Sequence, residues 1–392
     1  MSVVNYIKQI REVAYRECQI MRHNSMYLYC LVIMPIIVIL FFTTLMGSGQ
    51  PVNMPVGVVD NDNTSTTRNI IRHLDAFQAT KIHKKYSDVA AARKAIQQNE
   101  IYAFIYIPKG TTAELGAMRQ PKISFYYSTT SLTAGSLLYK DLKTISTLGS
   151  ASAVSTVLSQ KGLSEKQIMA MLQPIVVDFH ALNNPSVNYS IYLSTMVIPA
   201  CLMLFLFILT PYSIGTEIKY NTSKEWLKTA GGNIYVALAG KLLPQTVISL
   251  ILFGGYMIYI YVFLGFPTMG GPIPIMLLTV LVVLASQGFG AFMFGFMPSL
   301  RMSMSTCCLW AVLSYSMVGM TFPISAMHPA LQALAQLFPL RHYYIIYELN
   351  IFNGYSLSYS VVNIIAMIVF ALLPLLVISR MRKAVTEYKY TP

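Results

Sequence analysis

Charged residues are scarce in this sequence, because Asp, Glu, Lys and Arg make up only 11% of its 392 residues. Soluble domains carry about 25% charged residues. This shortage, with 55% hydrophobic residues, excludes an ordinary soluble protein and indicates a membrane protein. The formal net charge is +13, but the basic residues cluster beside apolar runs, where anionic lipid attracts them. We therefore expect a lipid bilayer as a partner and no nucleic acid.

The sequence also lacks the motifs of enzymes and nucleotide-binding proteins. It has no HExxH, no CxxC pair and no GxSxG, and its six histidines are scattered. Gly240-Lys241 comes closest to a P-loop, but Leu242 follows the lysine where Ser or Thr is needed. We expect no catalytic, metal or cofactor-binding residue in this chain, so an intramembrane enzyme ranks last among its functions.

Long apolar runs are what the sequence has instead. A helix needs about 20 apolar residues to cross the bilayer core. Six runs meet this length, at 26–46, 188–213, 235–264, 272–297, 302–322 and 359–380. They predict a mainly α membrane protein with six transmembrane helices. No Asp, Glu, Lys or Arg lies well inside a run, which argues against ion-driven or proton-driven transport.

Basic residues flank the runs on alternate sides. The segments rich in Lys and Arg are 1–25, 214–234, the turn at Arg301 and the tail 381–392. The loop 265–271 has no charge, and 323–358 has Arg341 as its one strong base. By the positive-inside rule we expect a multi-pass protein of the bacterial cytoplasmic membrane with both termini in the cytoplasm.

Two polar pieces accompany the spans. Residues 1–25 have apolar residues at three- and four-residue spacings and a basic polar face, which favours an interfacial amphipathic helix over a plain cytoplasmic one. Residues 47–187 alternate strand and helix patterns, which predicts an extracytoplasmic α/β domain inserted between helices 1 and 2. Its strands are expected at 54–60, 79–87, 101–108 and 121–128.

Asp60-Asn61-Asp62-Asn63 in this domain resembles the start of a calcium loop. The EF-hand also needs Gly at its sixth position and Glu at its twelfth, and Ser65 and Ile71 stand there. A turn at a strand end followed by a helix cap is the better interpretation.

A short charged helix is predicted between the second and third runs, in segment 214–234. Thr222 and Glu225 have the spacing of a capping box, and Gly231-Gly232 ends the helix. Two turns are unstable alone, so Trp226 must pack against something. Either the helix packs on its own membrane domain, or it docks into a cytoplasmic partner.

Here the chain resembles the type 2 family of ABC transporter permeases. The matching residues of the charged segment are Glu217, Thr222, Glu225, Leu227 and GKLLP at 240–244. Asn221 stands where Gly is usual, and Ala230 where Pro is common. GMTFPISAMHPALQALAQLFPLRHYY at 319–344 resembles the segment before the last span of the family, and PVGVVDNDN resembles members with a large domain after the first span.

The resemblance implies a dimer of permeases, homo- or heteromeric, in which each copy couples to a separate ATPase that binds ATP and Mg²⁺. Trp226, Leu227 and Lys228 would face that ATPase, while Glu217 anchors the coupling helix to span two. Segment 323–358 would form re-entrant outer-gate helices rather than an interfacial loop. The residues assigned to this gate are Phe322, Pro323, Pro329 and Pro339.

Small and polar residues of the fourth run either line a route or pack helices, and packing is favoured. They are Ser286, Gln287, Gly288, Gly290 and Gly295. Because the spans offer hydroxyls and amides rather than charges, an amphiphilic or hydrophobic cargo such as a drug or lipid is expected, moved out of the cell. By analogy with exporters of double-membrane bacteria, a periplasmic adaptor is a further candidate partner. The alternative function is a membrane-anchored receptor or assembly protein acting through its outer domain.

Overall fold

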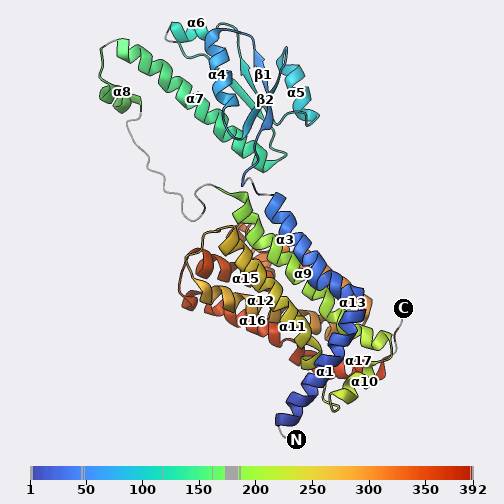
Figure 1. Cartoon of the computed structure of the whole chain (residues 1–392). Coiled ribbons are helices and arrows are strands. Elements are labelled where there is room, and N and C mark those ends of the chain that lie inside the picture. Colours follow the sequence, from blue (N-terminus) through green and yellow to red (C-terminus); the bar gives the residue numbers. More distant parts are fainter. Residues whose placement is uncertain are drawn as a thin grey trace. The chain divides into compact units, whose positions relative to one another are not determined.

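The computed structural model describes residues 3–45, 47, 49–117, 119–160, 162–172, 184, 187–388 and 390. Lys389 of the expected basic tail and residues 173–183 of the expected outer domain lie outside them. Contacts divide the chain into two compact units (Figure 1). The membrane unit is Met1–Gly47 with Leu182–Pro392, and the α/β unit is Ser48–Ala181.

Five helical stretches of the membrane unit are long and apolar enough to cross a bilayer, counted over the described residues. The first is α2 (Ser25–Leu28), the π-helix η1 (Tyr29–Ile33) and α3 (Met34–Leu45), and the second is α9 (Tyr189–Lys219). The third is α11 (Ile234–Ile258) with η2 (Tyr259–Phe263), and the fourth is α12 (Pro272–Phe296). The last is η5 (Leu357–Ser360), α16 (Val361–Leu372) and α17 (Pro374–Glu387). They correspond to five of the six predicted runs.

The predicted span 302–322 is not confirmed. Its helix, α13 (Leu300–Ser316), has 17 residues and ends before the apolar run does. Gly319 has a φ of 99°, which a helix cannot accommodate, and Arg341 Nη1 donates to the Val318 carbonyl at 3.0 Å. The chain therefore leaves the helix because a left-handed glycine and an arginine stabilise a turn there.

Short elements follow α13 within segment 323–358, where re-entrant helices are predicted. They are η3 (Ile324–Ala326), α14 (Pro329–Ala335), α15 (Pro339–Ile346) and the π-helix η4 (Tyr347–Phe352). Pro329 and Pro339 each stand at the first position of a helix, where the missing N–H has no cost. Leu340 and Tyr343 of α15 are buried, and the Tyr343 hydroxyl donates to the carbonyl of Thr195 in α9 at 3.2 Å. Helix α15 thus belongs to the core of the unit.

Helix α12 lies at the centre of the membrane unit, and its glycines lie where other helices come close. A Cβ added at Gly288 would lie 2.5 Å from backbone of α16. At Gly290 and Gly295 it would lie 2.9 Å from side-chain carbons of α9 and α17. Ser286 donates to the Val282 carbonyl of its own helix at 2.6 Å, and the Gln287 carbonyl oxygen accepts from the Thr246 hydroxyl at 2.7 Å. These contacts favour helix packing over a route.

Adding one methyl group at Gly288 is expected to destabilise the membrane unit by about 1–3 kcal/mol, because backbone atoms cannot yield as a flexible side chain does. Gly255 of α11 is the matched control, since a Cβ there meets nothing within 4 Å. Gly255→Ala should stabilise the helix by up to about 1 kcal/mol. Unfolding of the two variants in detergent measures both effects, and equal effects would disprove the packing role.

The α/β unit contains a sheet with strand order β2-β1-β3-β4. Its strands are β1 (Met54–Asp60), β2 (Thr80–Lys85), β3 (Ala103–Ile107) and β4 (Ser124–Tyr127), and β4 alone is antiparallel to its neighbour. Its helices are α4 (Ser65–Asp75), α5 (Val89–Gln97), α6 (Thr111–Gly116), α7 (Leu132–Gln160) and α8 (Glu165–Leu172). Helices α4 and α7 cover one face of the sheet and α5 the other (Figure 1). The four strands agree with the sequence pattern, whereas α6 was not expected.

The Asp60–Asn63 loop is a turn and helix cap, as predicted. The Asp60 carboxylate accepts from the Thr67 hydroxyl at 2.9 Å, and Thr64 caps α4 with a reciprocal pair of bonds. The Asp62 carboxylate accepts from the Gly110 N–H at 2.7 Å and from the Thr112 hydroxyl at 2.6 Å. No group of three or more metal-ligating side chains occurs among the described residues.

Asp62 makes the α/β unit sensitive to acid. The hydrogen bond from the Thr112 hydroxyl, with those from the Thr112 and Gly110 N–H groups, lowers the pKa of this carboxyl below its ordinary 3.8. Because the folded pKa is the lower one, the stabilisation is present above about pH 4 and is lost as the pH falls through the folded pKa. Asp62→Asn should lower the melting temperature at about pH 6, and the difference should shrink as the pH falls below about 4 and through the folded pKa. A pH-independent difference, followed by circular dichroism, would contradict this assignment.

Candidate coupling site

Helix α10 (Ser223–Thr229) is the short charged helix predicted between α9 and α11. The chain reaches it through Asn221, whose φ is 58°, and leaves it through Gly231 and Gly232, with φ of 64° and 77°. Left-handed conformations favour Gly and tolerate Asn. Asn221 therefore supplies a left-handed conformation that glycine and asparagine adopt most readily.

The predicted capping box of α10 is wrong. Thr222 makes no side-chain cap hydrogen bond to the helix. Its hydroxyl donates instead to the Glu217 carboxylate at 2.5 Å, and Glu225 lies 3.6 Å from the Arg16 guanidinium. The carboxylate of Glu217 competes successfully for the hydroxyl because a charged acceptor makes the stronger bond. Thr222 thus joins α10 to the end of α9.

The side chain of Trp226 is turned inward, so the expectation that it faces a partner is wrong. It is 0% exposed, and its Nε1–H donates to the Ala237 carbonyl of α11 at 3.2 Å. The Lys241 ammonium lies 5.1 Å from the centre of its ring, a cation–π contact. The tryptophan therefore fixes α10 to α11. Leu227 is half-buried, and the exposed side chains of α10 are Lys224, Glu225 and Lys228.

Behind α10 lies an ion network that connects three helices. Lys241 of α11 lies 2.6 Å from Glu17 of α1 (Val3–His23) and 2.7 Å from Glu217 of α9. The exposed fractions of these three side chains are 1%, 1% and 2%. Arg16 Nη1 contacts the same Glu217 carboxylate at 2.6 Å, so two cations balance two anions. An unpaired buried charge costs several kcal/mol, so the network holds α1, α9 and α11 in one arrangement.

Helix α1 takes part in the site because it crosses α11 at close range. A Cβ added at Gly240 would lie 2.7 Å from the Val13 Cβ, and Val13 and Glu17 are buried. Val4 and Ile7 are exposed, which leaves part of the apolar face free of protein contact. Contact of this face with lipid stays a prediction.

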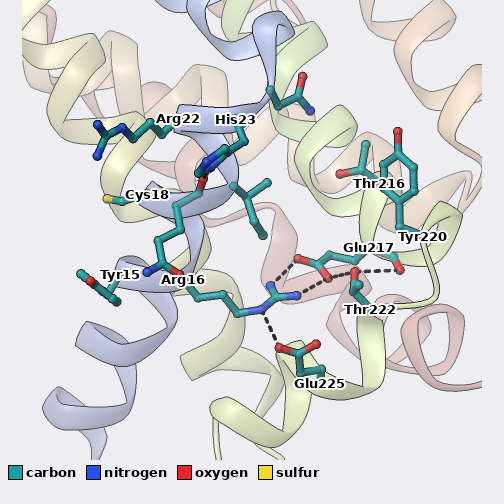
Figure 2. A pocket seen from close by; sticks show the side chains of 13 residues that line it. Tyr15, Arg16, Cys18, Arg22, His23, Thr216, Glu217, Tyr220, Thr222 and Glu225 are labelled. Atoms are coloured by element: carbon teal, nitrogen blue, oxygen red, sulfur yellow. Dashed lines mark hydrogen bonds and ion pairs between the residues drawn. The ribbon is translucent and has the colours of Figure 1, made fainter.

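A surface hollow of about 920 Å³ opens between α1 and the junction of α9 with α10. Figure 2 shows Arg16 extending from α1 toward Glu217 and Glu225, with Thr222 beside Glu217. Burial lowers the pKa of Arg16, but the hydrogen bond and the charge of Glu217 outweigh it and raise the pKa above its ordinary value. The guanidinium therefore keeps its charge at the wall of the hollow.

For the part of the chain that it describes, the structure shows no contact among the four residues assigned to an outer gate that would identify them as one. Phe322, Pro323 and Pro329 are exposed, whereas Pro339 is buried at the start of α15. Their role in gating stays a prediction.

Comparison with known families decides the class of the protein. The family model for the ABC-2 family transporter protein matches residues 26–380. The chain belongs to the ABC-2 transporter family. It is thus a multi-pass membrane protein and the membrane subunit of an ABC transporter, and the family implies association with an ABC ATPase. A comparison with curated proteins gives no match.

Proposed function

We propose that this ABC-2 protein is the permease of an exporter, which moves an amphiphilic or hydrophobic cargo, a drug or a lipid, out of the cell. A separate ATPase binds ATP and Mg²⁺ and supplies the energy, and two permease copies form the transport unit. The protein lies in the inner membrane of a bacterium with both termini in the cytoplasm, as the distribution of basic residues supports.

The attachment of α10 is the observation that carries the coupling mechanism. One side of this helix is fixed by Trp226 to α11 and by Thr222 to Glu217 of α9. Its other side leaves Lys224 and Lys228 exposed, with Leu227 half-buried between them. A partner that pushes on the exposed side moves α10 as a rigid body together with the helices attached to it.

The contact with the ATPase is then made by Leu227 and the two lysines, while Trp226 transmits the motion inward. Arg16 and Glu217 carry the same motion to α1 and α9 through their ion pair. This division of roles follows from burial, because a side chain that is fully buried in its own subunit has no surface left for a partner.

A double variant tests the exposed side of α10. Leu227→Asp with Lys228→Glu should lower cargo-stimulated ATP hydrolysis and transport at least about tenfold, since a wrong charge at an interface costs several kcal/mol and about 1.4 kcal/mol is tenfold. The melting temperature should fall much less than for loss of Trp226, because Lys228 is exposed and Leu227 only partly packs against the core that holds α10.

Lys85→Glu is the matched control, since it reverses the charge of an exposed lysine in the α/β unit. It should leave ATP hydrolysis unchanged. Retention of stimulated hydrolysis and transport by the α10 variant would refute coupling through this helix and favour a receptor or assembly role.

A further inference from the structure

A polar stripe begins at Lys241 of the ion network and continues along the buried face of α11. Lys241, Gln245 and Ser249 follow one another at four-residue spacing, so they share one side of the helix. Their exposed fractions are 1%, 0% and 3%. The α11 polar stripe, defined by these three residues, thus extends from charged groups into the apolar interior.

Two members of the stripe are buried without a protein partner. Among the described residues, neither the amide nitrogen nor the amide oxygen of Gln245 has a hydrogen-bond partner, and the Ser249 hydroxyl has none either. An unpaired buried polar group costs about 1–3 kcal/mol, so apolar side chains would make this face more stable. Such groups are explained when a bound water, another state of the protein or a ligand pairs with them.

Ser249 of the stripe lies beside a segment of the first span that contains a π-helical turn and a proline. A groove of about 10 Å³ lies between Ser249, apolar residues of α9 and the π-helix η1. Its lining includes Cys30 and Pro35, and Cys30 is partly exposed on the outside of the unit. Proline removes one helical hydrogen bond, and π-helical turns are frequent at functional sites. This segment is therefore suited to widening, whereas the groove as it stands has room for no more than about one water.

We infer that Gln245 and Ser249 bind the uncharged polar headgroup of an amphiphile, which enters from the lipid past η1 while its apolar chain stays among α9, η1 and α11. The amide of Gln245 supplies two donors and an acceptor, and the Ser249 hydroxyl supplies one donor and an acceptor. The headgroup is uncharged because Lys241 is already neutralised by Glu17 and Glu217. The inference rests on the proposed export of an amphiphilic cargo and names its binding site.

Thiol labelling of the full transporter in liposomes tests the inference, with the native cysteines replaced by serine. Ser249→Cys should react with a charged, membrane-impermeant thiol reagent in at least one nucleotide state, because the groove must open during the cycle. Oleamide should slow this reaction severalfold, whereas oleate, with the same chain and a carboxylate, should not. Val283→Cys is the control and should stay unreactive. Val283 is fully buried on α12. The hydrogen bond between Thr246 of α11 and Gln287 of α12 places Val283 at about the same level along the helices as Ser249.

Gln245→Leu gives an independent readout. Removing an unpaired amide should leave the melting temperature equal or higher, while stimulation of ATP hydrolysis by oleamide should fall about tenfold. A lower melting temperature, or unchanged stimulation, would overturn the site.

The remaining outcomes of the labelling are equally decisive. No reaction in any nucleotide state, reaction without protection by oleamide (water only), or equal protection by oleate would each overturn the inference. Suppose that one of these outcomes is found while ATP hydrolysis still depends on the exposed side of α10. The headgroup site is then disproved, and the proposed export function is not. If no ATPase associates with the protein at all, the proposed function itself is disproved.

Discussion

Replacing Lys241 with methionine is expected to destabilise the membrane unit by about 3–5 kcal/mol, because it leaves two buried carboxylates without their shared cation. Glu17 and Glu217 are 1% and 2% exposed, so water cannot take over the role of the ammonium. Arg16 remains beside Glu217, which leaves Glu17 as the group with the larger loss. Unfolding followed by tryptophan fluorescence in detergent measures the change.

Lys383→Met is the matched control for this prediction. Lys383 lies 3.9 Å from Glu387, but both side chains are more than 60% exposed. Surface pairs of this kind contribute about 0–1 kcal/mol. Adding Glu17→Gln to the Lys241→Met variant should recover part of the lost stability, since it removes the unpaired charge. Equal effects of the two lysine substitutions, or no recovery, would show that the network is not a buried electrostatic unit.

Replacing Trp226 with alanine is expected to cost about 3–5 kcal/mol of local stability and to detach α10 from α11. The change removes a fully buried ring, the hydrogen bond to Ala237 and the contact with the Lys241 ammonium. Because α10 has only seven residues, nothing within the helix itself replaces this attachment. Hydrogen exchange of the α10 amides should accelerate strongly, and stimulation of ATP hydrolysis should fall with it.

Trp226→Phe separates packing from hydrogen bonding, since it keeps most of the ring and loses the N–H donor. We expect it to lose about 1–2 kcal/mol. Leu227→Ala provides the neighbouring control, because Leu227 is only half-buried and should barely affect exchange at α10. If Trp226→Ala left exchange unchanged while abolishing stimulation, the side chain would face the ATPase after all.

Much of the membrane unit is predictable from the sequence because the bilayer demands long apolar helices. Five of the six apolar runs form such helices. The run 302–322 is not confirmed as a span. Hydropathy does not report backbone conformation, and the turn after α13 depends on Gly319 and on Arg341, which is distant in sequence. Strands β1 and β3 were predictable because each is a short apolar run between turn signals, whereas Ile82 is the one apolar residue of β2.

The candidate site was predictable only in its location. A capping pattern depends on local sequence, but Glu217 supplied a stronger acceptor for Thr222 than the helix end did. The ion network joins residues 201 and 224 positions apart, and no local pattern connects α1 with α9 and α11. Lys241 near the start of an apolar run was the available signal, since a lysine there needs an anion once it is buried.

The proposed coupling depends first on contact between the exposed side of α10 and an ATPase. Affinity purification of the full chain in mild detergent, with quantitative mass spectrometry, tests it most directly when wild type and the Leu227→Asp, Lys228→Glu variant are compared. We expect an ABC ATPase in equal copy number with the wild type and its loss from the equally folded variant. An ATPase retained in full by the variant, or absent from the wild type, would show that the exposed side of α10 does not hold an ATPase.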